Sequence, residues 1–153
     1  MGQEDPSFDE IRNRALRLLA RREHTESELR KKLAGGERAA ANVQAVILHL
    51  KRANYLSDDR FTEVYVRSRM ERGDGPLKIR HGLKARGVQD SIIERYLDVA
   101  DEVWETILHG VWARKFGTAP SDYKAWAKQA RFLQSRGFTA EQINKVVSST
   151  EQE

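Results

Sequence analysis

The chain has 153 residues, of which 39% are hydrophobic and 33% are charged, and it contains no cysteine. The length suits one compact domain or a short array of repeats, and the absence of cysteine excludes disulfide bonds, thiolate zinc sites and cysteine nucleophiles. The net charge of +4 is only a weak indication of a nucleic-acid partner. No apolar run approaches the ~18 residues that a membrane span needs, so we expect no membrane association.

Helix-start patterns mark the first third of the chain. In a capping box, Ser or Thr is followed three residues later by Glu or Gln, and each side chain satisfies an end N–H group of the backbone. Two such boxes are Ser7 with Glu10 and Thr25 with Glu28. They predict one helix over residues 8–22 and a short one that Gly35-Gly36 ends. Apolar spacing predicts a third helix that reaches Tyr55.

The middle third predicts three more helices. Ser57 caps the first, which Gly73 stops. Pro76 begins the second, because proline is favoured in a first helical turn, and Gly87 ends it. The third carries Ile92, Ile93, Tyr96 and Leu97. The first of these helices places four residues on one face, which are Phe61, Val64, Tyr65 and Ser68.

The last third follows the same plan. A longer helix spans Val103 to Trp112, and another begins near Ser121 and stops before Gly137. Thr139 and Gln142 form a third capping box that opens the final helix. No segment alternates with a period of two residues, so we expect no strands and an all-α fold.

The nine helices repeat in threes. Leu33, Leu83 and Leu133 lie 50 residues apart, and residues 83–88 (LKARGV) parallel residues 133–138 (LQSRGF). Helices this short bury little apolar surface alone, so neighbouring units must supply contacts. We therefore expect three tandem three-helix repeats forming an elongated, curved array, with a single compact bundle as the alternative. The expected units are 7–56, 57–98 and 99–150.

Basic residues are densest in the middle unit, around the turn from Gly73 to Pro76. The set is Arg67, Arg69, Arg72, Lys78, Arg80, Lys84 and Arg86. Two positive helix faces around a tight turn suit a phosphate backbone. The helix N-terminus at Pro76 is expected to add free N–H groups and a partial positive charge. A solvated helix surface is the alternative.

A second basic cluster lies near the N-terminus. It consists of Arg21, Arg22, Arg30, Lys31 and Lys32, interleaved with glutamates. Ion pairs within the helices explain this cluster more simply than a binding site does.

No pattern in the sequence indicates catalysis. There is no Walker loop, G-x-S-x-G or H-E-x-x-H motif. The four histidines are scattered, which gives no metal site, and Asp58-Asp59 suits the first turn of a helix. The three tryptophans lie on apolar faces, where core packing is the better explanation. We expect no enzyme activity, no cofactor, no metal and no small-molecule substrate.

Four segments, in order along nearly the whole chain, resemble motifs of the RecX family. They are residues 18–33 (LLARREHTESELRKKL), residues 55–61 (YLSDDRF), the block with Arg67-Ser68-Arg69, Gly73-Asp74-Gly75-Pro76 and Ile79-Arg80, and residues 131–138 (RFLQSRGF). Each motif is weak alone, but four in order are specific. At Asp74 this chain departs from the family, which often has an aromatic or neutral residue there.

The resemblance implies tandem three-helix repeats and a role as a negative regulator of RecA. Family members bind the RecA filament on single-stranded DNA and block its extension, which lowers ATPase, strand-exchange and co-protease activity. For this chain it implies a cytoplasmic monomer whose affinity for single-stranded DNA alone is weak. A stand-alone DNA-binding module and a helical adaptor that binds only protein are the alternatives.

Overall fold

The computed structural model describes residues 6–151, and within that range the chain is helical without strands. The all-α prediction is confirmed. The α-helices are α1 (Phe8–Arg21), α2 (Glu26–Leu33), α3 (Ala40–Arg52), α4 (Asp58–Glu71), α5 (Pro76–Ala85), α6 (Asp90–Leu97), α7 (Asp101–Lys115), α8 (Tyr123–Ser135) and α9 (Ala140–Glu151), and a short 3-10 helix, η1 (Glu37–Ala39), precedes α3. No helix in the described part of the chain is long and apolar enough to cross a membrane.

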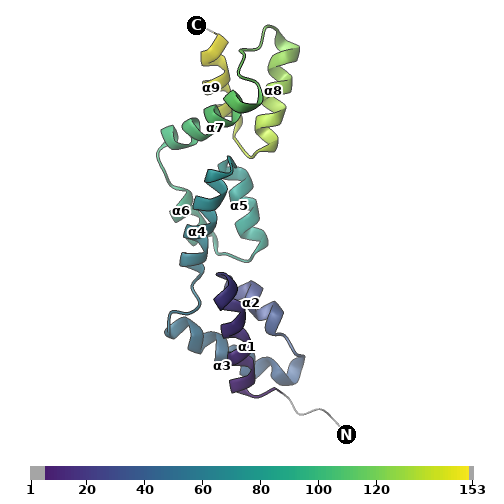
Figure 1. The fold of residues 1–153 in the computed structure, drawn as a ribbon, viewed down its shortest axis with the longest axis vertical. Coiled ribbons are helices and arrows are strands. Elements are labelled where there is room, and N and C mark those ends of the chain that lie inside the picture. The colour runs from purple at the N-terminus through teal and green to yellow at the C-terminus, as the bar shows by residue number, and fades with distance from the viewer. Residues whose placement is uncertain (1–5, 152–153) are drawn as a thin grey trace.

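The helices form three units stacked end to end in an elongated array (Figure 1). Unit 1 contains α1–α3, unit 2 contains α4–α6 and unit 3 contains α7–α9. In each unit the first helix packs against the third. The tandem three-helix arrangement is therefore confirmed, whereas the unit limits 7–56, 57–98 and 99–150 stay predictions.

Each unit has its own small apolar core. Representative fully buried residues are Leu29, Ile47 and Leu50 in unit 1, Ile79, Leu83 and Ile93 in unit 2, and Leu108, Leu133 and Phe138 in unit 3. Burying one such side chain contributes about 1.5–3 kcal/mol. Since each core contains few of them, contacts between units must add stability. Trp104 and Trp112 are buried, as expected, and Trp126 flanks the third core.

The helix starts agree closely with the capping patterns. Both hydrogen bonds of the capping box are present at Ser7, Thr25 and Thr139, and Ser57 accepts a hydrogen bond from the Arg60 amide. Two expectations were wrong. α3 ends at Arg52 rather than reaching Tyr55, and α8 begins at Tyr123, capped by Asp122, rather than near Ser121.

One kind of contact between units occurs at both junctions. The start of a unit's second helix docks on the turn after the second helix of the next unit. At the first junction the Thr25 hydroxyl donates to the Arg86 carbonyl over 2.7 Å. At the second junction the Gly75 amide donates to the Arg136 carbonyl, also over 2.7 Å. The LKARGV and LQSRGF segments therefore resemble each other because both accept a preceding unit.

Unit 1 has a different segment after its second helix. That helix is followed by Ala34-Gly35-Gly36 and then by η1. A side chain added at Gly36 would meet nothing within 4 Å, whereas one added at Gly87 would lie 2.4 Å from Ser27. The segment after α2 therefore makes no close contact at Gly36 of the kind that the turn after α5 makes at Gly87.

Candidate nucleic-acid interface

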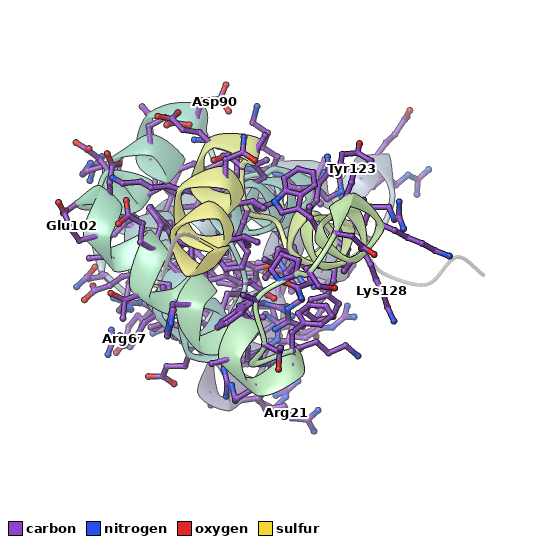
Figure 2. All side chains as sticks on the ribbon, turned by 90° about the horizontal axis from the view of Figure 1, so that it is seen from above. Arg21, Arg67, Asp90, Glu102, Tyr123 and Lys128 are labelled. Atoms are coloured by element: carbon purple, nitrogen blue, oxygen red, sulfur yellow. The ribbon has the colours of Figure 1, made fainter. Side chains whose placement is uncertain are left out.

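Five of the seven basic residues expected at the interface make ion pairs with acidic residues of unit 2. The pairs are Arg67–Glu63 at 3.4 Å, Arg69–Asp74 at 3.8 Å, Lys78–Asp74 at 3.4 Å, Arg80–Glu94 at 2.9 Å and Lys84–Asp90 at 3.4 Å. These acids partly neutralise the five charges. Viewed down the long axis, Arg67 and Asp90, the partner of Lys84, project from different sides of the molecule (Figure 2). The seven residues therefore do not share one face.

Three of the seven, Arg69, Arg72 and Arg86, line a groove between units 1 and 2 of about 530 Å³. We call it the first junction groove. Arg22, from the second basic cluster, joins them there. Tertiary packing thus brings together cations from three different helix ends and from α4.

The apolar face predicted on α4 also lines the first junction groove. All four of its members, Phe61, Val64, Tyr65 and Ser68, belong to the lining. Val64 is 47% exposed, although Phe61 is buried. One edge of this face packs into the core, and the other forms the groove wall.

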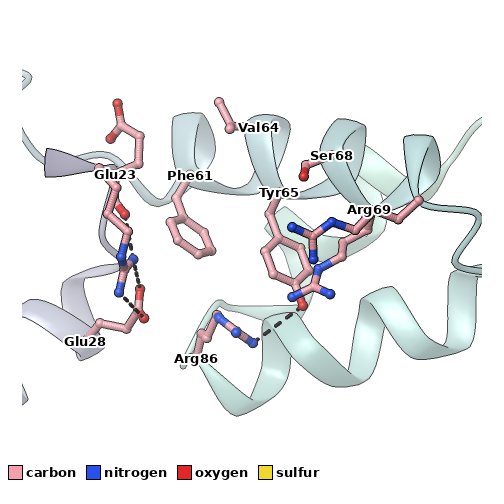
Figure 3. A pocket seen from close by; sticks show the side chains of 10 residues that line it. Glu23, Glu28, Phe61, Val64, Tyr65, Ser68, Arg69 and Arg86 are labelled. Carbon is pink, nitrogen blue, oxygen red and sulfur yellow. Dashed lines mark hydrogen bonds and ion pairs between the residues drawn. The ribbon is translucent and has the colours of Figure 1, made fainter.

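Tyr65 holds two of the groove cations in place (Figure 3). The guanidinium carbons of Arg69 and Arg86 lie 4.9 and 5.0 Å from the centre of its ring, which is cation–π geometry. The ring fits because Gly82 has no side chain, since a Cβ there would lie 2.0 Å from the tyrosine hydroxyl. The ring therefore orients charge within the groove.

Acidic residues occur at one side of the first junction groove. Glu28 pairs with Arg22 at 3.2 Å, and Glu23 pairs with Arg60 at 2.5 Å. Burial raises the pKa of Glu28, but hydrogen bonds from Arg22 and the Thr25 amide outweigh that effect and hold the pKa below its usual value. Glu28 therefore stays ionised and neutralises Arg22, which leaves Arg72 and Arg86 as the uncompensated cations.

A buried histidine supports the turn that carries Arg22. Burial lowers the pKa of His24 below its ordinary 6.5, and the positive charges of Arg22 and Lys32 act in the same direction. Its Nδ1 donates to the Arg22 carbonyl over 3.0 Å, and its Nε2 accepts from Lys32 over 2.9 Å. A neutral imidazole thus fixes the backbone beside the groove.

A second groove, of about 360 Å³, lies between units 2 and 3. We call it the second junction groove. Its lining contains four cations and no carboxylate, and consists of Arg72, Val111, Arg114, Lys115, Phe132 and Arg136. The Lys115 ammonium lies 5.1 Å from the centre of the Phe132 ring. Because Arg72 lines both grooves, they adjoin at this residue and form a largely basic path along the array, interrupted by Glu23 and Glu28 in the first groove.

Asp74 divides the cations near the second junction into two groups. It is buried, and it lies 3.8 Å from Arg69, 3.4 Å from Lys78 and 3.7 Å from Arg136. Arg72, Arg86, Arg114 and Lys115 make no ion pair with any carboxylate whose side chain the structure describes. Asp74 therefore neutralises part of the charge of Arg69, Lys78 and Arg136, but not that of the other four cations.

The expectation of free N–H groups at the start of α5 was wrong for two of them. The Gly75 amide donates to the Arg136 carbonyl over 2.7 Å, and the Leu77 amide donates to the Gly137 carbonyl over 2.9 Å. These groups are used in the junction between units 2 and 3, and they have no capacity left for phosphate.

The second basic cluster is mostly separate from the grooves. Arg30 pairs with Glu26 one turn away on α2, which is the intrahelical pairing expected for this cluster. Lys32 contacts His24, and Arg21 and Lys31 are exposed outside the lining of both grooves.

Three groove cations, Arg114, Lys115 and Arg136, lie outside both predicted basic sets. The repeat spacing contained part of the signal, because Arg136 stands 50 residues after Arg86 in the parallel segments. Arg114 and Lys115 carry no comparable pattern. Among the described residues, no group of three or more His, Asp or Glu side chains could hold a metal ion.

Comparisons with known proteins agree along the whole length of the chain. Family models for the first, second and third three-helix domains of RecX match residues 12–50, 57–97 and 101–147. Regulatory protein RecX of Halorhodospira halophila is 40% identical over the whole chain and 96% of its own length. That of Chromohalobacter salexigens is 38% identical over 90% of each chain.

Two solved structures share the fold. The crystal structure of RecX from Lactobacillus salivarius has a TM-score of 0.81 at 22% identity and covers 95% of this chain and 97% of that one. A crystal structure of a regulatory protein RecX has a TM-score of 0.77 at 21% identity and covers 93% of this chain and 73% of that one.

Proposed function

The chain belongs to the RecX family of regulatory proteins, and on this basis we propose that it is a negative regulator of the recombinase RecA. It binds the RecA filament on single-stranded DNA and blocks its extension. ATP hydrolysis, strand exchange and the co-protease activity that triggers the SOS response all fall as a result. The protein acts in the cytoplasm as a monomer, by binding alone and without a cofactor.

The observation that supports this proposal best is the elongated array of three units with a basic path along it. Arg72 lines the grooves at both junctions, so the path passes from unit 1 to unit 3. An extended surface of this kind suits a ligand that is itself a repeating polymer. A protein lying along a filament bridges successive protomers, and at the growing end it occludes the site of the next one.

The test is a titration of RecA ATPase activity on single-stranded DNA, with the protein added before or after filament assembly. Blocked extension predicts inhibition at sub-stoichiometric amounts, because one bound molecule stops the addition of many protomers. It also predicts stronger inhibition when the protein is added before assembly. An unchanged ATPase rate at stoichiometric amounts, in either order, contradicts the proposal.

The uncompensated groove cations favour one alternative function, a stand-alone DNA-binding module. This alternative predicts that the protein binds naked DNA tightly and with a steep salt dependence but leaves RecA ATPase unaffected. The combination of the two measurements therefore separates a filament regulator from a simple DNA-binding protein.

A further inference from the structure

The two junctions carry buried titratable side chains at equivalent places. His24 and Asp74 lie 50 residues apart, each immediately before the residue that contacts the next unit, Thr25 or Gly75. His24 is 1% exposed and Asp74 is 3% exposed. Asp74 is a carboxylate beside three cations, whereas His24 is a base beside the Lys32 ammonium group. The same position in the repeat therefore holds a group that attracts its cationic neighbours at one junction and a group that is repelled by them, once protonated, at the other.

The turn that contains His24 makes the contacts of unit 1 with unit 2. Residues on both sides of the histidine take part. The contacts are the ion pair of Glu23 with Arg60 at 2.5 Å, the hydrogen bond from the Thr25 hydroxyl to the Arg86 carbonyl over 2.7 Å and the hydrogen bond from the Glu26 amide to the Asp58 carboxylate over 2.8 Å. The conformation of this turn therefore decides whether the two units stay docked.

His24 fixes the turn only while its ring is neutral. Its Nδ1 donates to the Arg22 carbonyl at the end of α1, and its Nε2 accepts from Lys32 on α2. A protonated imidazole has no acceptor, so its second N–H group would face the ammonium group over the same 2.9 Å. Burial and the charges of Arg22 and Lys32 lower the pKa of His24 below 6.5, although the hydrogen bond to the Arg22 carbonyl and the charge of Glu28 oppose them.

The sign of the pH dependence follows from this shift. Above about pH 6.5 the ring is neutral whether docked or released, so the turn stays closed. Below that value a released ring binds a proton that the docked ring refuses, and acid favours release. Burial raises the pKa of Asp58 above its usual 3.8, so protonation of Asp58 favours the docked form and acts in the opposite direction. At the second junction the hydrogen bonds of the Gly75 and Leu77 amides join backbone groups, which do not titrate.

We infer that His24, hydrogen-bonded between Arg22 and Lys32, is a proton-sensitive latch that holds unit 1 against unit 2 and releases it when the imidazole is protonated. Arg22 and Arg86 line the first junction groove, and they belong to the two segments that the latch holds together. Release therefore changes their spacing. The inference concerns the conformation of the free protein and depends on neither RecA nor nucleic acid.

The experiment is hydrogen exchange of single amides in the full chain, followed by NMR at about pH 7.5 and about pH 5.5. The Glu26 amide donates across the first junction and the Leu77 amide across the second, so each reports the opening of one junction. After correction for the intrinsic exchange rate at each pH, the protection of Glu26 is expected to fall by up to about tenfold in acid, because release binds one proton. The protection of Leu77 is expected to change much less.

Three variants assign the effect to the latch. His24→Gln keeps a donor and an acceptor without a titratable ring and is expected to abolish the fall. His49→Gln is the matched control, because the exposed His49 also accepts from a cation, Arg12, but within unit 1; it should keep the parental fall. Should His24→Gln fail to fold, Lys32→Met removes the ammonium group that faces the ring and is expected to make the fall smaller.

Four results overturn the inference. They are equal protection of Glu26 at both pH values, a parental fall in folded His24→Gln or Lys32→Met, an equal fall at Leu77, and loss of the fall in His49→Gln. Circular dichroism at both pH values separates release from unfolding. Release keeps the helical signal of the parent, and a loss of that signal in acid contradicts a latch that acts between folded units.

Discussion

At the scale of single residues, two glycines meet in a close backbone contact between units 2 and 3. A Cβ at Gly75 would lie 2.4 Å from the carbonyl carbon of Gly137 and 2.6 Å from the Phe138 amide nitrogen. Gly75 has an ordinary extended backbone, so the restriction is space alone, whereas Gly137 also has a φ of +95°. The backbones of units 2 and 3 therefore approach each other as closely as only glycine permits.

Gly75→Ala is expected to destabilise the protein by about 1–3 kcal/mol, because the clashing atoms belong to backbone and cannot rotate away. The measurement is the free energy of unfolding in urea. Gly110 provides the control, since it lies inside α7 with nothing within 4 Å of an added Cβ. Gly110→Ala should stabilise by about 0.5–1 kcal/mol. Equal effects of the two substitutions contradict the assigned role of Gly75.

At the scale of helices, capping and docking coincide at the start of α2. Thr25 accepts a hydrogen bond from the Glu28 amide, as an N-cap does, and its hydroxyl hydrogen goes to the Arg86 carbonyl of unit 2. Ser7 forms the same capping box on α1 but is exposed and makes no contact with another unit in the described hydrogen bonds. One helix end therefore has a purely local role, and the other joins two units.

Thr25→Ala is expected to lower the free energy of unfolding by about 2 kcal/mol, and Ser7→Ala by about 1 kcal/mol. Both changes remove a cap, but only the first also leaves a part-buried carbonyl without its donor. Urea unfolding of the two variants tests the difference. Thr25→Ser keeps the hydroxyl and should recover most of the loss. If Ser7→Ala proves as costly as Thr25→Ala, the Arg86 contact contributes nothing measurable.

At the scale of the molecule, stability is shared between neighbours. Unit 2 contacts a unit on both sides, while units 1 and 3 each contact one (Figure 1). In an array of this kind, the stability of a unit is approximately its own plus that of its interfaces. Local unfolding should therefore be rarer in the middle unit than in the other two.

Native-state hydrogen exchange is expected to show stronger protection of the amides in α4–α6 than of those in α1–α3 or α7–α9. Gly75→Ala should lower the protection of α7–α9 and leave α1–α3 almost unchanged, because it weakens only the second junction. Mass spectrometry of exchanged peptides resolves the three units. Loss of protection spread evenly over all three would mean that the array unfolds as a single cooperative body.

The helices and their repetition could be predicted from the sequence because their causes are local. Capping boxes at Ser7, Thr25 and Thr139, the proline at the start of α5 and the glycine after α4 each act within a few residues. The 50-residue spacing of the leucines then revealed three units. The starting point of α8 was misplaced because Ser121 and Asp122 are both good caps, and local chemistry alone does not choose between them.

Only the tertiary structure decided which basic side chains lack an acidic partner. The sequence placed seven cations in one basic set, but pairing depends on distances between segments far apart in the chain. Arg80 meets Glu94 of the next helix, whereas Arg72 comes to lie beside Arg114 and Arg136 of unit 3. The amides at the start of α5 were likewise assigned to the junction by a neighbouring turn. Local patterns and repeat spacing determined a helical repeat protein, and the packing of one unit on the next determined where its uncompensated charge is exposed.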